Sequence, residues 1–161
     1  NIEDNFIDSD LTLADYITEI IKSFKETSKK EFILNLDLYN NPLNITKSIE
    51  IVYGLRNFIG NANKFSKNKV FINIKSDNDI TEITIEDDGE GYTNDVLRKI
   101  GEPYINSYKT SIKSKSGLGL GIFIGKTLLE KNYANILCRN SKTRGGAEVN
   151  IKWKNKDLLK I

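Results

Sequence analysis

Hydrophobic residues recur along the chain at two spacings, one typical of helices and one typical of strands. Near the start, five apolar residues repeat every three or four positions, as on one face of a helix: Leu13, Ile17, Ile20, Ile21 and Phe24. Thr12 and Asp15 resemble a capping box, with Asp in place of the usual Glu, so we expect this helix to begin at about Leu11. Lys29 and Lys30 are expected to end it.

Alternation of apolar and polar residues predicts five strands. The segments are Glu31–Leu38, Val70–Lys75, Ile80–Glu86, Ala134–Arg139 and Ala147–Trp153. The first strand places four apolar residues on one face: Phe32, Leu34, Leu36 and Leu38. A short polar turn separates the second strand from the third, which predicts a β-hairpin.

Three more helices are predicted between these strands. A long helix is capped near Thr46 and runs to about Phe65. Its expected core stripe is Ile51, Leu55, Phe58, Ala62 and Phe65. A short helix is expected over Asn94–Ile100, and helical spacing resumes over Gly117–Lys131. Residues 101–116 show no periodicity.

The resulting order, α-β-α-β-β-(α)-loop-α-β-β, favours an α+β fold over alternating parallel units. In this fold one sheet carries its helices on one face. The 161 residues, 39% of them hydrophobic, suit a single domain. No internal repeat or boundary is visible, and residues 1–10 are acidic and polar, like a linker.

Composition and charge exclude several classes of function. The 24 basic and 22 acidic residues leave a net charge of +2, which gives no reason to expect a nucleic-acid or membrane surface. No apolar stretch approaches the roughly 20 residues that span a bilayer. The single cysteine, Cys138, is expected to be a small core residue. Because Met and His are both absent, we expect a fragment of a longer chain, with any histidine chemistry supplied by another domain or chain.

The first candidate cluster is Asn57, Asn61 and Lys64, which share one face of the long helix beside its apolar stripe. Amide oxygens are neutral hard ligands that suit Mg²⁺ when phosphates supply the negative charge. A lysine one turn further on can meet a phosphate as a point charge. The same residues would also suit a polar helix surface that binds nothing.

The second cluster, Asp87-Asp88-Gly89-Glu90-Gly91, directly follows a predicted strand. A carboxylate at a strand end can accept a hydrogen bond from an exocyclic amine, which favours adenine if the site is buried. The two glycines would let the backbone approach a ligand closely. A plain acidic turn or a metal loop would show the same residues.

The third cluster is the glycine-rich run Ser116-Gly117-Leu118-Gly119-Leu120-Gly121 at the start of a predicted helix. Free N–H groups and the helix dipole at such a position favour phosphate. The run lacks the P-loop Gly-Lys-Ser/Thr and has no preceding strand, so it matches neither the P-loop nor the dinucleotide fingerprint. The long polar loop before it predicts a mobile lid. Helix packing through small residues is the alternative.

The order and separation of these clusters resemble the nucleotide-binding ATPase domain shared by gyrase, Hsp90, MutL and the sensor histidine kinases (the Bergerat or GHKL fold). The resemblance covers about residues 11–153. Asn57–Phe65 resembles the N box of histidine kinases, Asp87–Gly91 the G1 box, the stretch ending at Tyr104 the F-box region, and Gly117–Gly121 the G2 box. It implies a two-layer α/β sandwich, in which helices cover one face of a mixed sheet, with a mobile ATP lid.

Within this superfamily, Asn57 stands where hydrolytic relatives carry a Glu that activates water. An amide cannot accept a proton at neutral pH, so the resemblance implies a domain that keeps MgATP for a better-placed nucleophile. The catalytic ATP-binding domain of a two-component sensor histidine kinase fits best. Residues 101–104 and 121–130 are similar to RegB/PrrB-type redox-responsive kinases. The alternatives are a hydrolytic ATPase of this superfamily and a non-catalytic nucleotide-sensing module.

Site roles follow from the resemblance position by position. Asn61 would ligate Mg²⁺, while Asn57 would support the metal or the phosphates and Lys64 would contact phosphate, which makes Asn57 and Lys64 the catalytic candidates. Asp87 would bind the adenine amino group. The other implied nucleotide-binding positions are Gly89, Gly91, Tyr92, Tyr104, Gly117, Leu118, Gly119, Leu120 and Gly121. Two positions depart from the family pattern, because Tyr92 replaces an aliphatic residue and Ala147 replaces a common Thr.

The resemblance also implies a domain arrangement and partners. Residues 1–10 would be the remnant of a linker from an upstream dimerisation domain that carries the phosphoacceptor His, and residues 11–161 would be the catalytic domain. ATP or ADP, that domain and a response regulator would be the partners, with no nucleic acid. The fragment would be a cytoplasmic domain that spans no membrane, and its parent a homodimeric sensor in the bacterial inner membrane. The lid, residues 104–116, is expected to be poorly ordered without nucleotide.

Overall fold

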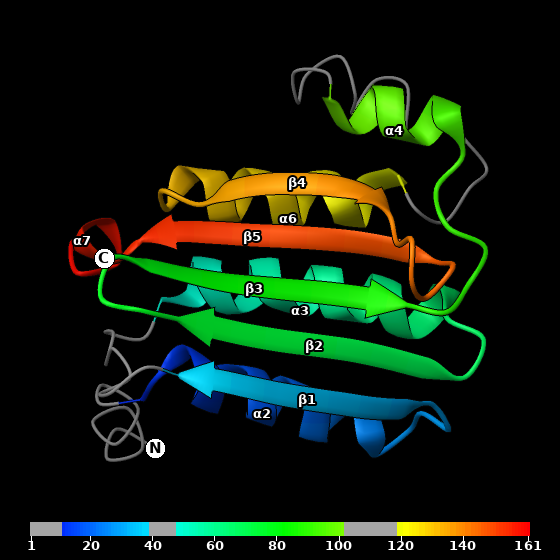
Figure 1. Cartoon of the computed structure of the whole chain (residues 1–161), viewed down its shortest axis with the longest axis horizontal. Coiled ribbons are helices and arrows are strands. Elements are labelled where there is room, and N and C mark those ends of the chain that lie inside the picture. The colour runs from blue at the N-terminus through cyan, green and yellow to red at the C-terminus, as the bar shows by residue number, and fades with distance from the viewer. Residues whose placement is uncertain (1–10, 39–47, 102–118) are drawn as a thin grey trace.

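A computed structural model of the chain describes residues 11–38, 48–101 and 119–161. Five strands form one sheet in the order β1-β2-β3-β5-β4, and helices α2, α3 and α6 lie on one of its faces (Figure 1). The strands are β1 (Glu31–Leu38), β2 (Lys69–Ser76), β3 (Ile80–Asp87), β4 (Asn135–Asn140) and β5 (Ala147–Lys154). The helices are α2 (Leu13–Lys25), α3 (Ile49–Phe65), α4 (Asn94–Gly101), α6 (Gly119–Lys131) and α7 (Asn155–Leu158). The predicted α+β fold with one covered sheet face is confirmed, and α7 is an element that the spacing did not predict.

Strand β3 is the middle strand of the sheet. β1 pairs in parallel with β2, and all other neighbours are antiparallel, so the sheet is mixed. The predicted hairpin of β2 and β3 is confirmed, and the Asp77 carboxylate closes its turn by accepting the N–H groups of Asp79 and Ile80 at 2.8 Å each. Because β3 has a strand on each side, its last residue, Asp87, is enclosed by other elements.

Helix α2 begins as predicted and ends earlier than predicted. The Thr12 hydroxyl accepts the N–H of Asp15, and the Asp15 carboxylate accepts the N–H of Thr12 at 2.9 Å, which completes the capping box. The helix ends at Lys25, so the prediction that it reaches Lys29 and Lys30 is wrong. Tertiary contacts explain the difference, since the Lys30 ammonium donates to the carbonyl of Ser66 just after α3.

Helix α3 has its N-cap at Ser48, whose hydroxyl accepts the N–H of Ile51 at 3.3 Å. The predicted cap near Thr46 is therefore two residues too early, and Thr46 itself lies outside the described residues. The helix ends at Phe65 as predicted. The expected stripe is buried apart from Phe65, which is only half-buried because it reaches the cavity described below.

Helix α3 packs closely on α6 because glycines face each other across the contact. A Cβ at Gly54 would lie 2.6 Å from Cγ of Leu129, which is fully buried. A Cβ at Gly125 would lie 3.2 Å from the carbonyl oxygen of Gly54. The small-residue packing proposed as the alternative for the glycine run thus operates at Gly125, beyond the end of that run.

The predicted inward face of β1 is only partly buried. Phe32 is buried, but Leu36 on the same face is 51% exposed. β1 is an edge strand, and helix α2 covers part of its length (Figure 1). Alternation in the sequence indicates a face, but the position of the strand in the sheet decides how far that face is covered.

We expect Gly54→Ala to destabilise the protein by about 1–3 kcal/mol relative to Gly60→Ala, because the added methyl group overlaps the buried Leu129 side chain. Gly60 lies on the same helix, and a Cβ there would meet only the ring edge of the half-buried Phe24 at 3.2 Å. Both changes replace a helical glycine by alanine, so the gain in helix propensity cancels in the comparison. Urea denaturation measures the difference, and equal stabilities would contradict the close packing of α3 on α6.

Candidate functional site

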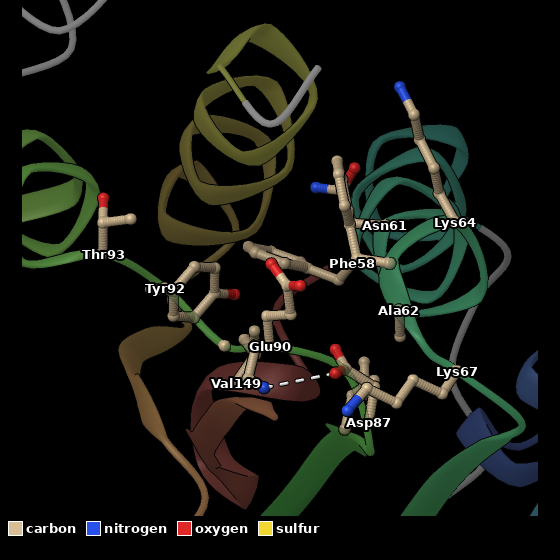
Figure 2. A pocket seen from close by; sticks show the side chains of 14 residues that line it. Phe58, Asn61, Ala62, Lys64, Lys67, Asp87, Glu90, Tyr92, Thr93 and Val149 are labelled. Carbon is tan, nitrogen blue, oxygen red and sulfur yellow. Dashed lines mark hydrogen bonds between the residues drawn. The ribbon is translucent and has the colours of Figure 1, made fainter. Parts of the chain in front are cut away.

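A cavity of about 420 Å³ lies where the ends of α3 and β3 meet the beginning of β5. Figure 2 shows Asp87 at one end of it and Asn61 at the other, with Tyr92 forming the wall opposite α3. The lining residues are Phe58, Asn61, Ala62, Lys64, Phe65, Lys67, Ile85, Asp87, Glu90, Gly91, Tyr92, Thr93, Ala147 and Val149. The first two clusters of the sequence therefore share one cavity.

Asp87 is a buried carboxylate, only 3% exposed, at the carboxyl end of β3. Its Oδ1 accepts the N–H of Gly89 at 2.8 Å and the N–H of Ala147 at 3.3 Å, the latter drawn as a dashed line in Figure 2. Burial raises the pKa of Asp87 above its ordinary value of 3.8, although both N–H groups act in the opposite direction. A group that donates a hydrogen bond to this carboxylate from the cavity would offset part of the desolvation.

The adjacent Asp88 has a structural task. Its Oδ1 accepts the N–H groups of Lys67, Asn68 and Lys69 at 2.8, 3.0 and 3.2 Å. Partial burial acts to raise the pKa of Asp88, but these backbone hydrogen bonds outweigh it and the pKa is lowered. Asp88 therefore holds the connection between α3 and β2 against the end of β3, beside the cavity.

The glycines of the second cluster make room for the chain itself. A Cβ at Gly89 would lie 2.1 Å from the carbonyl oxygen of Phe65, and one at Gly91 would lie 2.7 Å from Oδ1 of Asn140. Gly91 also has a φ of +80°, which favours glycine. A third glycine, Gly146, passes Asp87 so closely that its Cβ would lie 2.1 Å from Oδ1. Gly91 lines the cavity and Gly89 packs on the end of α3, and the approach of both backbones to a ligand stays a prediction.

Tyr92 is 7% exposed, and its ring forms part of the cavity wall. Burial raises its pKa well above the ordinary value of 10.0, with smaller contributions from Cys138 and Asp87. Cys138, on β4, packs against the core, and burial raises the pKa of its thiol to about 12. The Tyr92 hydroxyl and the Cys138 thiol are therefore both neutral at physiological pH, and Cys138 is partly buried against the core.

The amides of α3 face the first turn of α6. A Cβ at Gly121 would lie 3.5 Å from Oδ1 of Asn61 and 3.6 Å from Oδ1 of Asn57, so both amides are next to α6 at this point. The Asn57 Nδ2 donates to the carbonyl of Tyr53 at 2.8 Å. The Asn61 Nδ2 is buried without a hydrogen-bond partner, and it alone has this status among the side chains that the structure describes.

These amides suit a metal ion that brings further ligands with it. The unpartnered Asn61 amide borders the cavity, and its oxygen is a neutral hard donor of the kind Mg²⁺ accepts. No group of three or more His, Cys, Asp or Glu residues that could hold a metal occurs in the described ranges. Among the described residues, the amides would offer Mg²⁺ neutral oxygen ligands that suit a metal bound together with anionic oxygens of a ligand.

Lys64 is exposed and extends away from the cavity, as Figure 2 shows. Its Nζ lies 5.3 Å from the centroid of the Phe65 ring. The residue lines the rim, so the structure brings its backbone to the site but directs the ammonium outward.

The remaining predicted positions are only partly covered by the structure. Tyr104, Gly117, Leu118 and the expected lid, residues 104–116, lie outside the described residues. Gly119 and Leu120 form the start of α6, next to Gly121. The third cluster is thus joined to the other two through Gly121.

Several lining residues were not singled out from the sequence. Lys67 extends along the cavity toward Asp87, and Thr93 lies in the wall near Tyr92, beside Glu90 of the second cluster (Figure 2). Val149 comes from β5, which is far away in the sequence. Phe58, Ala62 and Phe65 did carry a signal, since the helical stripe of α3 continues directly into the cavity.

The chain matches known proteins in both sequence and structure. Residues 46–157 match the family model described as histidine kinase-, DNA gyrase B- and HSP90-like ATPase. The sensor histidine kinase RegB of Cereibacter sphaeroides is 35% identical over 125 residues, which cover 68% of this chain and 27% of RegB. The sensor histidine kinase CpxA of Escherichia coli is 26% identical over 108 residues, covering 67% of this chain and 22% of CpxA. The chain thus spans about a quarter of the length of these relatives.

Solved structures share the fold. The catalytic domain of histidine kinase ThkA superimposes with a TM-score of 0.70 at 18% identity, covering 91% of this chain and 96% of that one. The mycobacterial sensor histidine kinase MprB gives a TM-score of 0.68 at 18% identity, covering 89% and 95%. Within the described ranges, the chain has no helix with the length and apolar character needed to cross a membrane.

The contributions of Asp87 and Asp88 to the free energy of unfolding are expected to change with pH in opposite directions. The raised pKa of Asp87 means that its contribution to stability is present below pH 3.8 and is lost as the pH rises through its folded-state pKa. Asp87→Asn should therefore gain stability relative to wild type as the pH rises above 3.8. The lowered pKa of Asp88 reverses the sign, because its contribution is present above pH 3.8 and is lost as the pH falls through its folded-state pKa.

Asp88→Asn is accordingly expected to be less stable than wild type at neutral pH, and to approach wild type in acid. Urea unfolding of both variants and of wild type, from acidic to neutral pH, measures these differences. Parallel pH profiles for all three proteins would contradict the electrostatic assignment of both carboxylates.

Proposed function

The chain belongs to the family of histidine kinase-, DNA gyrase B- and HSP90-like ATPases, and on that premise we propose that it is the ATP-binding catalytic domain of a sensor histidine kinase. It would bind ATP in the cavity between α3, β3 and β5 and present the γ-phosphoryl group to a histidine on a dimerisation domain outside this sequence. A response-regulator aspartate would receive the group next. The single observation that carries the proposal is the pairing, within one cavity, of a buried carboxylate with an unpartnered amide.

The cavity has two chemically different ends, which suit the two ends of ATP. Asp87 is a buried carboxylate, so it favours a ligand group that donates a hydrogen bond, such as the adenine amino group. Tyr92, Val149 and the ring of Phe58 supply apolar walls for a flat base. At the other end, the neutral amides of Asn61 and Asn57 face Gly121. The complex of the related kinase ShkA with AMPPNP supports the same ligand class.

We assign the metal-binding role to Asn61. Its amide oxygen would ligate Mg²⁺, which when bound neutralises charge on the phosphate oxygens during transfer. Asn57 would hold the phosphates or the metal from one helical turn away. Gly121 lies next to both amides near the start of α6, where the helix N-terminus would favour the negative charge of the triphosphate. Lys64 would reach a phosphate only by turning inward from its exposed rotamer.

The same residues explain why transfer to histidine is favoured over hydrolysis. A carboxylate in the place of Asn57 could accept a proton from water, but an amide cannot. The Asn57 amide nitrogen also donates a hydrogen bond to the backbone carbonyl of Tyr53, which fixes the orientation of the Asn57 side chain. Bound ATP would therefore persist until a nucleophile arrives in line from the other domain, and the geometry between the domains would control the reaction.

The wider assembly follows from the same proposal. The parent protein would be a homodimeric sensor kinase of the RegB type, anchored in the bacterial inner membrane, with this domain on the cytoplasmic side. Residues 1–10 would belong to the connection with the dimerisation domain.

The kinase proposal predicts where the label from γ-labelled ATP goes. The 161-residue chain is expected to bind ATP, to release phosphate slowly and to carry no label itself, because it contains no histidine. The full-length protein is expected to acquire acid-labile label on its own histidine. Autoradiography after acid and alkali treatment, together with a phosphate-release assay on the isolated chain, distinguishes the outcomes.

Label that appears only as free phosphate would instead indicate a hydrolytic ATPase. ATP binding without transfer or hydrolysis would indicate a nucleotide-sensing module. Failure to bind ATP at millimolar concentration would exclude all three functions.

The metal assignment predicts that Asn61→Ala weakens ATP binding by about tenfold with Mg²⁺ present and changes it little in EDTA. Asn63→Ala is the matched control, because Asn63 lies on the same helix but its amide binds the Ser28 hydroxyl at 2.6 Å. Titration calorimetry on wild type and both variants, with and without Mg²⁺, measures the six affinities. A loss of equal size in both conditions would show that Asn61 is no metal ligand.

A further inference from the structure

The backbone of Tyr92 is held by a single side chain from a distant strand. Oδ1 of Asn140 accepts the Tyr92 N–H at 2.7 Å, and Nδ2 of Asn140 donates to the Tyr92 carbonyl at 3.0 Å. Forty-eight positions separate the two residues in the sequence. The side-chain amide of Asn140 therefore pairs with both the N–H and the carbonyl of Tyr92, as the backbone of a neighbouring strand would.

Tyr92 needs such a partner because it lies between regular elements. β3 ends at Asp87 and α4 begins at Asn94, so neither a ladder nor a helix supplies partners for the intervening backbone. Tyr92 itself is buried, and its polar backbone groups would be costly to leave unpaired there. The Asn140 amide replaces the missing secondary structure at this point.

Gly91 makes this contact possible. With a φ of +80° it turns the chain toward β4, and a Cβ there would come within 2.7 Å of the Asn140 Oδ1. Two constraints therefore favour glycine at Gly91: the left-handed backbone turn and the space occupied by the Asn140 amide. The contact is part of the local fold in the absence of any ligand.

The turn that follows Asn140 is hydrogen-bonded to the Asp87 end of the cavity. The residue after it, Ser141, donates its N–H to the carbonyl of Gly146 at 2.7 Å and its hydroxyl to Glu86 at 2.5 Å. The turn then returns to Ala147, whose N–H binds Asp87. The same β4–β5 turn therefore positions both Asp87 and Tyr92.

We propose that Asn140 is a positioning residue for nucleotide binding, which fixes the Gly91–Tyr92 backbone so that the Tyr92 ring closes the wall of the cavity. It acts through Tyr92 and needs no contact with the ligand. The proposal rests on the proposed function, because it takes ATP as the occupant of the cavity. It assigns to the β4–β5 turn a task in recognition that the three sequence clusters do not include.

The test is a double-mutant cycle between Asn140 and Tyr92, measured as affinity for a non-hydrolysable ATP analogue by titration calorimetry. Asn140→Ala removes two hydrogen bonds and is expected to weaken binding about tenfold. In a Tyr92→Ala background the same change is expected to have almost no effect, since the wall that Asn140 positions is already absent. Asn150→Ala is the matched control, because Asn150 donates to the Thr84 hydroxyl at 3.2 Å on the opposite face of the sheet, and it should leave affinity unchanged.

Urea unfolding of each variant ensures that binding is compared between folded proteins. If Asn140→Ala does not fold, Asn140→Asp replaces it in the cycle. This variant keeps the acceptor for the Tyr92 N–H but sets a carboxylate oxygen against the Tyr92 carbonyl, so it should weaken binding at least tenfold and only when Tyr92 is present.

Two results would overturn the proposal while leaving the proposed function intact. In one, wild type binds the analogue and the Asn140 variant binds equally well. In the other, Asn140→Ala lowers the affinity for the analogue by the same factor in the wild-type and the Tyr92→Ala backgrounds. If wild type itself does not bind the analogue, the proposed function fails instead.

Discussion

The site depends on one buried carboxylate and the two backbone N–H groups that hold it. Asp87 ends the middle strand of the sheet, and its Oδ1 accepts hydrogen bonds from Gly89 and Ala147. One donor lies two residues ahead in the chain and the other lies sixty residues away, at the start of β5. Charge burial is costly, so the end of β3, the loop after it and the β4–β5 turn must remain together to keep this carboxylate partnered.

Three glycines let other segments of the chain come close to Asp87 and the cavity. Gly89 admits the Phe65 carbonyl, Gly91 admits the Asn140 amide, and Gly146 passes directly over Asp87. Each missing side chain lets one more segment reach the cavity. The cavity is thereby lined by residues of α3, β3 and β5 and of the segments that follow α3 and β3.

The distribution of charge within the cavity accounts for its chemistry. A carboxylate occupies the end proposed for the base, while neutral amides on α3 and the glycine at the start of α6 form the end proposed for the phosphates. In the proposed function, Asn57 would provide no base, so the site would hold a phosphoryl donor for an external nucleophile. That division between a stored donor and a separate acceptor is what a regulated kinase needs.

The amino-acid sequence by itself determined the elements and the chemistry of their residues. Periodicity located five strands and four of the helices, because burial of one face is a local pattern, and the capping box of Thr12 and Asp15 is local too. Asn61 and Asp87 were found for the same reason, since a helix face and a strand end can be recognised within a few residues. The tertiary structure decided the rest. Val149 reaches the cavity, and Asn140 reaches the Tyr92 backbone, only because β4 and β5 return beside β3, and contacts across forty or more residues leave no periodic trace in a single sequence.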